Sequence, residues 1–96
     1  MLNQVTIQSR ADVAIKPLVE LAFHAQLKSL KHGIERTKER LAAFESRFGI
    51  STAEMERCLK ADRMEETLDT IDWCMELDAL RLLEEQYNAL REARID

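Results

Sequence analysis

The stretch that decides the fold is residues 23–48, which read FHAQLKSLKHGIERTKERLAAFESRF. Apolar or small uncharged side chains return every three or four residues, which is the heptad pattern of helices that pack side by side. The residues in register are Phe23, Leu27, Leu30, Ile34, Thr37, Leu41, Phe44 and Phe48. We expect a long helix over about residues 17–48, because Pro17 suits a first helical turn and Gly49 suits the residue after a helix.

The residues after Gly49 predict a sharp corner. The sequence Ser51-Thr52-Ala53-Glu54 has the spacing of a capping box, and Ile50 and Met55 are placed as its hydrophobic staple. A short helix over about residues 52–61 would therefore reverse the chain. The pair Asp62 and Glu65 repeats the spacing of a cap and predicts a last helix over about residues 63–93.

The N-terminal residues 4–8 predict a different element. The sequence Gln4-Val5-Thr6-Ile7-Gln8 alternates polar and apolar side chains, which is the signature of a short, half-buried β-strand. No second strand candidate follows it in the sequence. We therefore expect it to pair with its copy in another chain, to pair with a different protein, or to remain an unpaired arm.

Two helices of these lengths do not fit inside a sphere. A helix of about 30 residues spans about 45 Å, whereas a compact globule of this chain length has a radius of gyration of about 12–13 Å. We expect one all-α domain over residues 1–96: an elongated antiparallel helical hairpin with a short corner helix and a short N-terminal β-strand. Because a two-helix hairpin leaves much of its apolar stripe wet, we predict a homodimer that completes a four-helix arrangement. The predicted dimer seam consists of Phe23, Leu27, Leu30, Ile34, Leu41, Phe44 and Phe48.

Composition narrows the class of protein. The chain is 46% hydrophobic and 33% charged and has a net charge of −4, with two Gly and one Pro, which fits a long-helix protein. No apolar run is long enough for a membrane span and no secretory leader is present, so we expect a cytoplasmic protein. No catalytic motif or phosphate-binding loop occurs, and we predict neither enzyme activity nor a cofactor.

Charge is distributed unevenly along the chain. Residues 1–50 carry eight basic and five acidic side chains, whereas residues 51–96 carry six basic and thirteen acidic ones. In the last helix, Glu65, Asp69, Asp72 and Glu76 recur at a spacing that stacks four carboxylates on one face. This face is either a solvated surface that pairs with the basic first helix, or a binding surface for a basic partner.

Trp73, the single tryptophan, stands next to Asp72 and has two interpretations. It is either an anchor of the core or a hot spot for a partner, because tryptophan is over-represented at such sites. The predicted partner-binding residues are therefore Glu65, Asp69, Asp72, Trp73 and Glu76.

The histidines and cysteines do not form a metal site. His24 and His32 lack further ligands at suitable spacing, and carboxylates on helices form di-iron sites only with a Glu-x-x-His motif, which is absent. Cys58 and Cys74 have acidic neighbours, so we expect reduced thiols that act as small core residues. No metal is predicted.

Several of these features together resemble a known class of protein. They are the short strand, Lys-Pro-Leu-Val-Glu at residues 16–20, Phe-Glu-Ser-Arg-Phe-Gly-Ile-Ser at residues 44–51, and Ile-Asp-Trp at residues 71–73. Over residues 4–93 the chain resembles small prokaryotic antitoxins of two-gene toxin–antitoxin modules, although Asp72 stands where those proteins commonly have Glu. The resemblance implies that the protein neutralises a small, basic, co-encoded toxin by direct contact.

Two other functions remain open at this stage. The first is a structural coiled-coil adaptor without a toxin partner. The second is a DNA-binding autoregulator of the ribbon-helix-helix type, in which Gln4, Thr6 and Gln8 would contact base edges. Only Arg10 and Lys16 lie nearby to contact phosphates, and the chain is acidic, so DNA is the less favoured partner.

Overall fold

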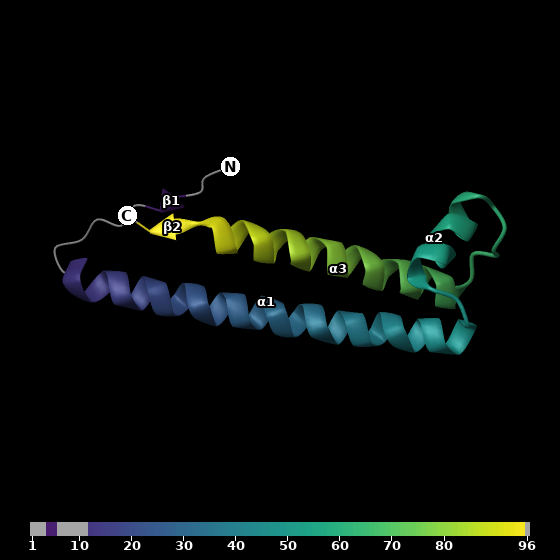
Figure 1. Ribbon diagram of the computed structural model, residues 1–96, viewed down its shortest axis with the longest axis horizontal. Coiled ribbons are helices and arrows are strands. Elements are labelled where there is room, and N and C mark those ends of the chain that lie inside the picture. The colour runs from purple at the N-terminus through teal and green to yellow at the C-terminus, as the bar shows by residue number, and fades with distance from the viewer. Residues whose placement is uncertain (1–3, 6–11, 96) are drawn as a thin grey trace.

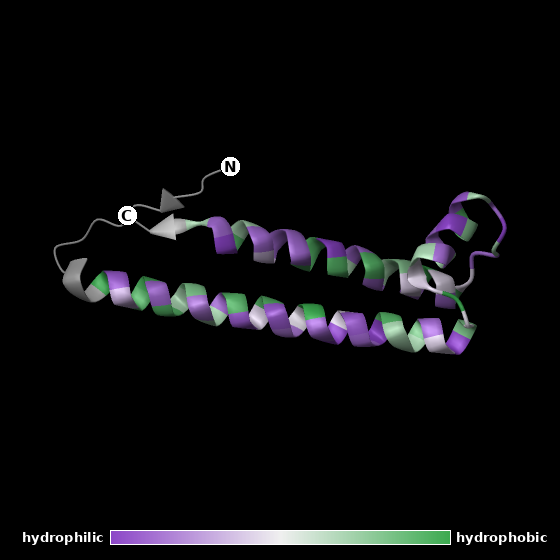
Figure 2. Ribbon diagram, in the orientation of Figure 1, coloured by the Kyte–Doolittle hydropathy of each residue, from purple (hydrophilic) through white to green (hydrophobic). Residues whose placement is uncertain are grey.

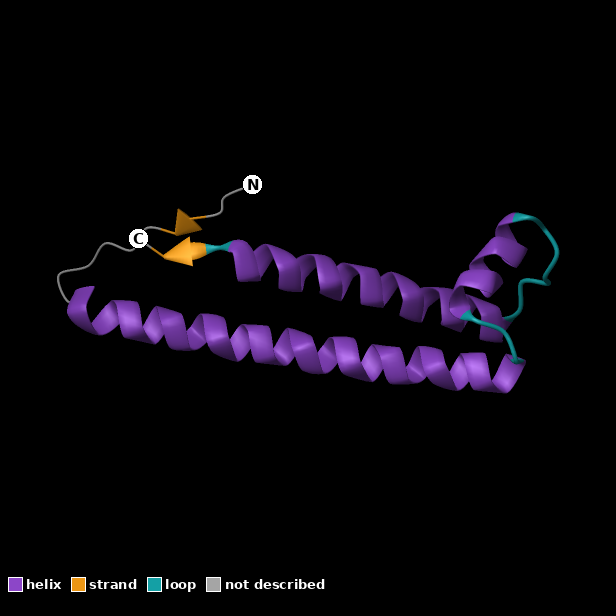
Figure 3. Cartoon of the chain, viewed as in Figure 1, coloured by secondary structure: helices purple, strands orange, loops and turns teal. Residues whose placement is uncertain are grey.

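The computed structural model describes residues 4–5 and 12–95 of the chain. Two long helices, α1 (Asp12–Phe48) and α3 (Leu68–Glu92), run antiparallel and pack along their lengths, and the short helix α2 (Thr52–Lys60) closes one end (Figure 1, Figure 3). The molecule measures 61 × 23 × 17 Å and has a radius of gyration of 18.9 Å. The predicted antiparallel hairpin is therefore present, and it is elongated.

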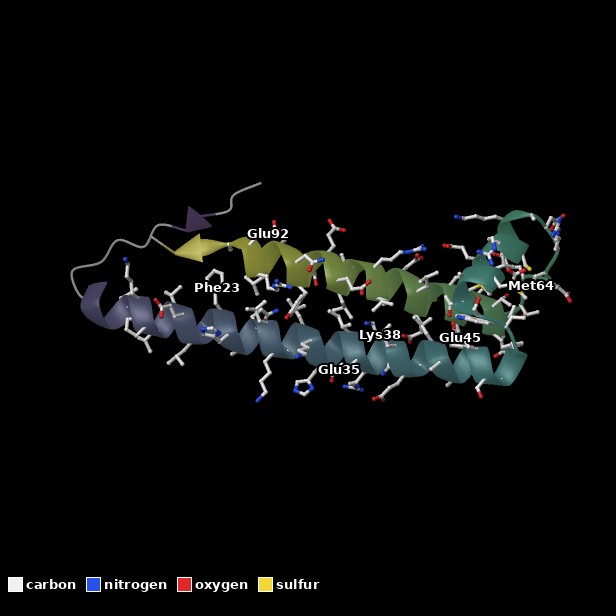
Figure 4. All side chains as sticks on the ribbon, in the orientation of Figure 1. Phe23, Glu35, Lys38, Glu45, Met64 and Glu92 are labelled. Atoms are coloured by element: carbon white, nitrogen blue, oxygen red, sulfur yellow. The ribbon has the colours of Figure 1, made fainter. Side chains whose placement is uncertain are left out.

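The apolar stripe of α1 packs inside this single chain. Leu30 and Leu41 are buried, and Phe23 points from α1 toward the C-terminal half of α3 (Figure 4). The four-helix arrangement was predicted because a lone hairpin was expected to leave this stripe wet. That arrangement stays a prediction. Within one copy, α3 and the corner helix α2 already pack against much of the stripe, although Phe48 remains 38% exposed.

The first helix begins earlier than predicted. It starts at Asp12 rather than near residue 17, so Pro17 lies inside it. Proline at this position removes one backbone hydrogen bond near the start of the helix, where the following turns can still hold the backbone in place. The outcome shows that Pro17 does not mark the boundary.

The turn into α2 is held by three caps. Gly49 ends α1 with a φ of +72°, a conformation that favours glycine, and its N–H donates to the Glu45 carbonyl over 2.8 Å. Ser51 caps α2, since its hydroxyl accepts from the Glu54 N–H. In addition, the side chain of Glu45 accepts the N–H of the next residue, Thr52, over 2.6 Å, at the corner seen in Figure 4.

The start of the last helix differs from the prediction by five residues. Asp62 does not cap α3. It terminates α2 with a φ of +56°, and the Asp62 and Arg63 N–H groups donate back to the carbonyls of Leu59 and Cys58. The helix α3 begins after Thr67, whose hydroxyl accepts from the Thr70 N–H while the Thr70 hydroxyl accepts from the Thr67 N–H.

Replacing Asp62 by Gly is expected to stabilise the protein by about 0.5–1 kcal/mol, because a side chain at positive φ carries a steric cost that glycine lacks. The measurement is urea unfolding followed by circular dichroism. Arg63→Gly is the matched control one residue further on, where φ is not positive, and it should not stabilise. Equal destabilisation by both substitutions would contradict this account of the turn.

The N-terminal strand prediction is wrong about the partner. Within the described residues, β1 (Gln4–Val5) pairs in parallel with β2 (Arg94–Ile95) of the same chain. Residues 6–8 of the predicted strand lie outside the described residues. A second strand was missed because a two-residue segment at the end of the chain has no alternating pattern to detect.

The core is concentrated at the end that α2 closes. Leu41, Met55 and Trp73, one from each helix, form its buried centre. Partly buried side chains pack around them: Phe44, Ile50, Leu59, Met64, Cys74, Leu77 and Leu80. Figure 2 shows hydrophobic and hydrophilic residues interspersed along both long helices.

Further along the hairpin, a glycine of α1 allows the two long helices to pack closely. A Cβ atom at Gly33 would lie 3.4 Å from the side chain of Leu83 on α3. One turn later, the buried Thr37 hydroxyl donates to the Gly33 carbonyl over 2.8 Å, so a polar residue sits in the stripe without an unsatisfied group. Gly33 thus leaves room for Leu83 and does not interrupt the helix.

Candidate partner-binding face

The four predicted carboxylates do not share one helix face. Glu65 lies in the connection before α3, whereas Asp69, Asp72 and Glu76 lie on α3. Asp69 accepts two hydrogen bonds from the Arg47 guanidinium, over 3.0 and 3.4 Å, and Glu76 pairs with Arg40 over 3.5 Å.

Asp72 lies between these two bridges in sequence. It is exposed and has no ion pair among the residues that the structure describes. Two members of the predicted stripe therefore join α3 to α1, as the solvated-surface interpretation expected, and Asp72 is directed to solvent.

Trp73 lies inside the monomer. Its side chain is 0% exposed, and its ring stacks on Phe44 and Phe48, with ring centroids 5.5 and 5.4 Å apart. Its indole N–H donates to the Thr52 hydroxyl over 3.0 Å. The structure therefore places Trp73 inside the hairpin, where it contacts both α1 and α2.

The most unusual surface lies on the side of α3 that faces away from α1. Four large apolar side chains are exposed there at helical spacing, and we call them the α3 outer face: Leu68 (81% exposed), Ile71 (40%), Met75 (63%) and Leu82 (54%). The helical spacing of Leu68, Ile71 and Met75 in the sequence suits a core face, but the structure exposes all three side chains. A row of this kind on a surface helix is typical of a binding site for another protein.

A groove opens beside the α3 outer face, between α1 and α3. Its volume is about 440 Å³. The lining residues are Arg40, Ala43, Phe44, Arg47, Asp72, Met75 and Glu76. Its apolar surface comes from Ala43, Phe44 and Met75, and its charged surface includes one carboxylate without an ion pair, that of Asp72.

Sequence reasoning missed the outer face because α3 has two apolar rows. The inner row includes Trp73, which is buried, and Leu77 and Leu80, which are partly buried, whereas the exposed row runs from Leu68 to Leu82. The sequence alone does not indicate which of the two rows turns toward α1.

A separate ion-pair cluster fastens α2 to α3. The Arg81 guanidinium donates two hydrogen bonds to the Glu56 carboxylate, over 2.8 and 2.9 Å, and Lys60 lies 3.9 Å from the same carboxylate. The hydrogen bonds from Arg81 lower the pKa of Glu56, although partial burial opposes them. The Glu54 pKa is also lowered, chiefly by its hydrogen bond with Arg57.

The Glu56–Arg81 bridge predicts a defined loss of stability in acid. Because the folded-state pKa of Glu56 lies below its unfolded value, the contribution is present above the unfolded pKa and is lost as pH falls through the folded pKa. Arg81→Met should therefore be less stable than the wild type at pH 7 by urea unfolding, and the difference in free energy of unfolding should shrink as the pH falls below the ordinary pKa of a glutamate. Arg36→Met, on the exposed side of α1, is the control. If the difference in free energy of unfolding between the wild type and Arg81→Met were unchanged in acid, the bridge would be ruled out.

The thiols and histidines form no site of their own. The Cys58 thiol lies 3.7 Å from a Glu54 carboxylate oxygen, and the Cys74 thiol lies 3.8 Å from the Met55 sulfur. Burial, together with the nearby Asp78, Glu56 and Glu66 carboxylates, raises the pKa of Cys74. His24 and His32 are exposed. The described part of the chain contains no group of three or more His, Cys, Asp or Glu side chains that could hold a metal ion.

Comparisons with known proteins returned no match to a family model, to a curated protein or to a solved structure. Within the part of the chain that the structure describes, none of the helices combines the length and apolar character needed to cross a membrane. We therefore infer a function from the surface of the hairpin.

Proposed function

We propose that this chain is a protein-interaction module that binds a basic, amphipathic segment of another protein through the α3 outer face. The observation that carries the proposal is the exposed row of Leu68, Ile71, Met75 and Leu82. Exposing large apolar side chains in a regular row is unfavourable in water, and a partner helix that covers them removes that cost.

The charge on α3 favours a basic partner over a second copy. Seven acidic and two basic residues lie on this helix, and Asp72 and Asp78 stand exposed on either side of the apolar row. Two copies that associate through this face would bring carboxylates together, whereas a basic segment would pair with them. Complementary charge would also speed the encounter in a salt-dependent way.

The resemblance to antitoxins defines the partner to test first. A toxin that acts on nucleic acid has a basic surface, and a co-encoded toxin would be neutralised if the α3 outer face covered that surface. The same proposal places the interaction in the cytoplasm. DNA binding gains no observation from the structure, because the side chains of Gln4, Thr6 and Gln8 lie outside the described residues. The exposed row would also serve a structural adaptor, and the experiment below separates the two functions.

The experiment uses the product of the reading frame next to this gene. Its affinity for the full chain is measured by calorimetry, and its toxicity is measured with and without co-expression of the chain. Replacing Leu68 and Leu82 by Ser should weaken binding at least about tenfold, which corresponds to about 1.4 kcal/mol, and should restore toxicity.

The matched control replaces Leu18 and Leu21 of α1 by Ser. These residues are 59% and 65% exposed, so they resemble Leu68 and Leu82 in type and exposure but lie on the other helix. Binding and neutralisation should be unchanged in the control. The proposal fails if the control weakens binding as much as the α3 variant, or if the neighbouring product neither binds nor is toxic alone.

A further inference from the structure

The groove beside the α3 outer face interrupts a regular row of contacts between the two long helices. At the corner end, the Arg47 guanidinium bridges to Asp69 and lies over the ring of Phe48, 5.3 Å from its centroid. Two helical turns away, Arg40 bridges to Glu76. Each of these contacts joins an arginine of α1 to a carboxylate of α3.

Between these two bridges, the helices present the aromatic ring and the carboxylate of such a contact but no arginine. Moving four residues back along α1 and three forward along α3 replaces Phe48 by Phe44 and Asp69 by Asp72. The same step replaces Arg47 by Ala43, which is exposed and lines the groove. The groove of about 440 Å³ thus lies where a third bridge would otherwise stand.

We infer that the groove accepts one arginine side chain of the partner protein, which completes the interrupted row from outside. The arginine's aliphatic stem packs on Met75 and Phe44, and its guanidinium binds Asp72. This arrangement suits arginine because the planar guanidinium can bind a carboxylate through two parallel hydrogen bonds. The inference rests on the proposed function, since the arginine belongs to the same basic segment that covers the α3 outer face.

The chain itself contains the same pair of contacts one step away along the helices. Arg47 makes both parts of it, with its guanidinium against a carboxylate of α3 and against an aromatic ring of α1. Arg40 and Arg47 are both already bridged and leave Asp72 accessible from outside. An apolar floor with one accessible carboxylate discriminates against neutral and acidic side chains.

The test uses a synthetic amphipathic helix as the probe, with a leucine row, lysine flanks and one central arginine, compared with the same peptide carrying citrulline at that position. Citrulline keeps the shape of arginine and lacks its charge. By fluorescence anisotropy, the wild-type chain should bind the arginine peptide about tenfold more tightly than the citrulline peptide. This preference should decrease as salt is added.

Two variants should abolish the preference by different routes. Asp72→Asn removes the charge, and Ala43→Arg supplies an arginine from within the chain and fills the groove. Ala43→Gln extends the side chain without charge and is the control for Ala43→Arg, while Glu85→Gln removes an exposed α3 carboxylate that does not line the groove. The Glu85→Gln variant should keep the tenfold preference.

Methionine methyl NMR gives an independent readout. The Met75 methyl signal should shift when the arginine peptide binds, and that of Met55, which is 0% exposed, should not. The inference is overturned if the preference for arginine survives in both Asp72→Asn and Ala43→Arg. A different result would contradict the proposed function itself: replacing Leu68 and Leu82 by Ser leaves the binding of both peptides unchanged.

Discussion

Replacing Trp73 by Ala is expected to lower the free energy of unfolding by about 3–5 kcal/mol. Trp73 has no exposed surface, and its ring stacks on Phe44 and Phe48 while its N–H reaches Thr52 at the start of α2. The substitution removes contacts with both other helices at once. Since a domain of this size is stable by about 5–15 kcal/mol, a large fraction of the variant should be unfolded at 37 °C.

The measurement is urea unfolding followed by far-ultraviolet circular dichroism, which does not depend on tryptophan fluorescence. Thr52→Val separates the hydrogen bond from the packing, because it leaves the indole N–H buried without a partner and should cost about 1–3 kcal/mol. Leu82→Ala, at an exposed α3 position, should cost less than either. A loss below 1 kcal/mol for Trp73→Ala would show that Trp73 is not the anchor of the core.

The corner of the hairpin could be predicted from the sequence because its signals are local. Gly49 and Ser51 act through backbone conformation and hydrogen bonds that span only a few residues, so the residue types alone indicate where α1 ends and α2 begins. The role of Asp62 was predicted wrongly because its signal is also local. Aspartate suits both a helix N-cap and a left-handed residue after a helix, and only the backbone at this turn decides between them.

The face of α3 could not be predicted because it depends on helix register against α1. Trp73 and Met75 are two residues apart, and a helix that turns one of them inward turns the other outward. The choice is made by contacts distant in sequence, such as the stacking of Trp73 on Phe44 and the bridges from Arg40 and Arg47. The groove could not be predicted either, because Ala43 of α1 lines it together with Asp72 of α3, and their proximity depends on the same helix register.

Replacing Leu41 by Asp is expected to unfold the protein at neutral pH. Leu41 is 6% exposed and packs with Met55 and Trp73, so the substitution places an unpaired carboxylate in the centre of the core. An unpaired charge in such a position costs several kcal/mol, in addition to the lost apolar contacts. The matched control is Leu21→Asp, at a position that is 65% exposed, and it should remain folded.

The loss of folding free energy caused by Leu41→Asp should become smaller as the pH is lowered. Burial disfavours the ionised carboxylate, so the pKa of the new Asp in the folded state would be raised above its unfolded value. The full penalty is then present above the folded-state pKa and shrinks as pH falls through it. Measured by circular dichroism, Leu41→Asp should regain helicity relative to the control between neutral pH and about pH 4.

The same variant tests whether a second copy takes part in the core. The sequence predicted Leu41 as a residue of a dimer seam, and the structure buries it within one chain. If one chain completes the core, the midpoint of thermal unfolding is independent of protein concentration for the wild type and for Leu21→Asp. A midpoint that rises with concentration, with a dimer in sedimentation equilibrium that Leu41→Asp dissociates, would instead place the seam between two copies.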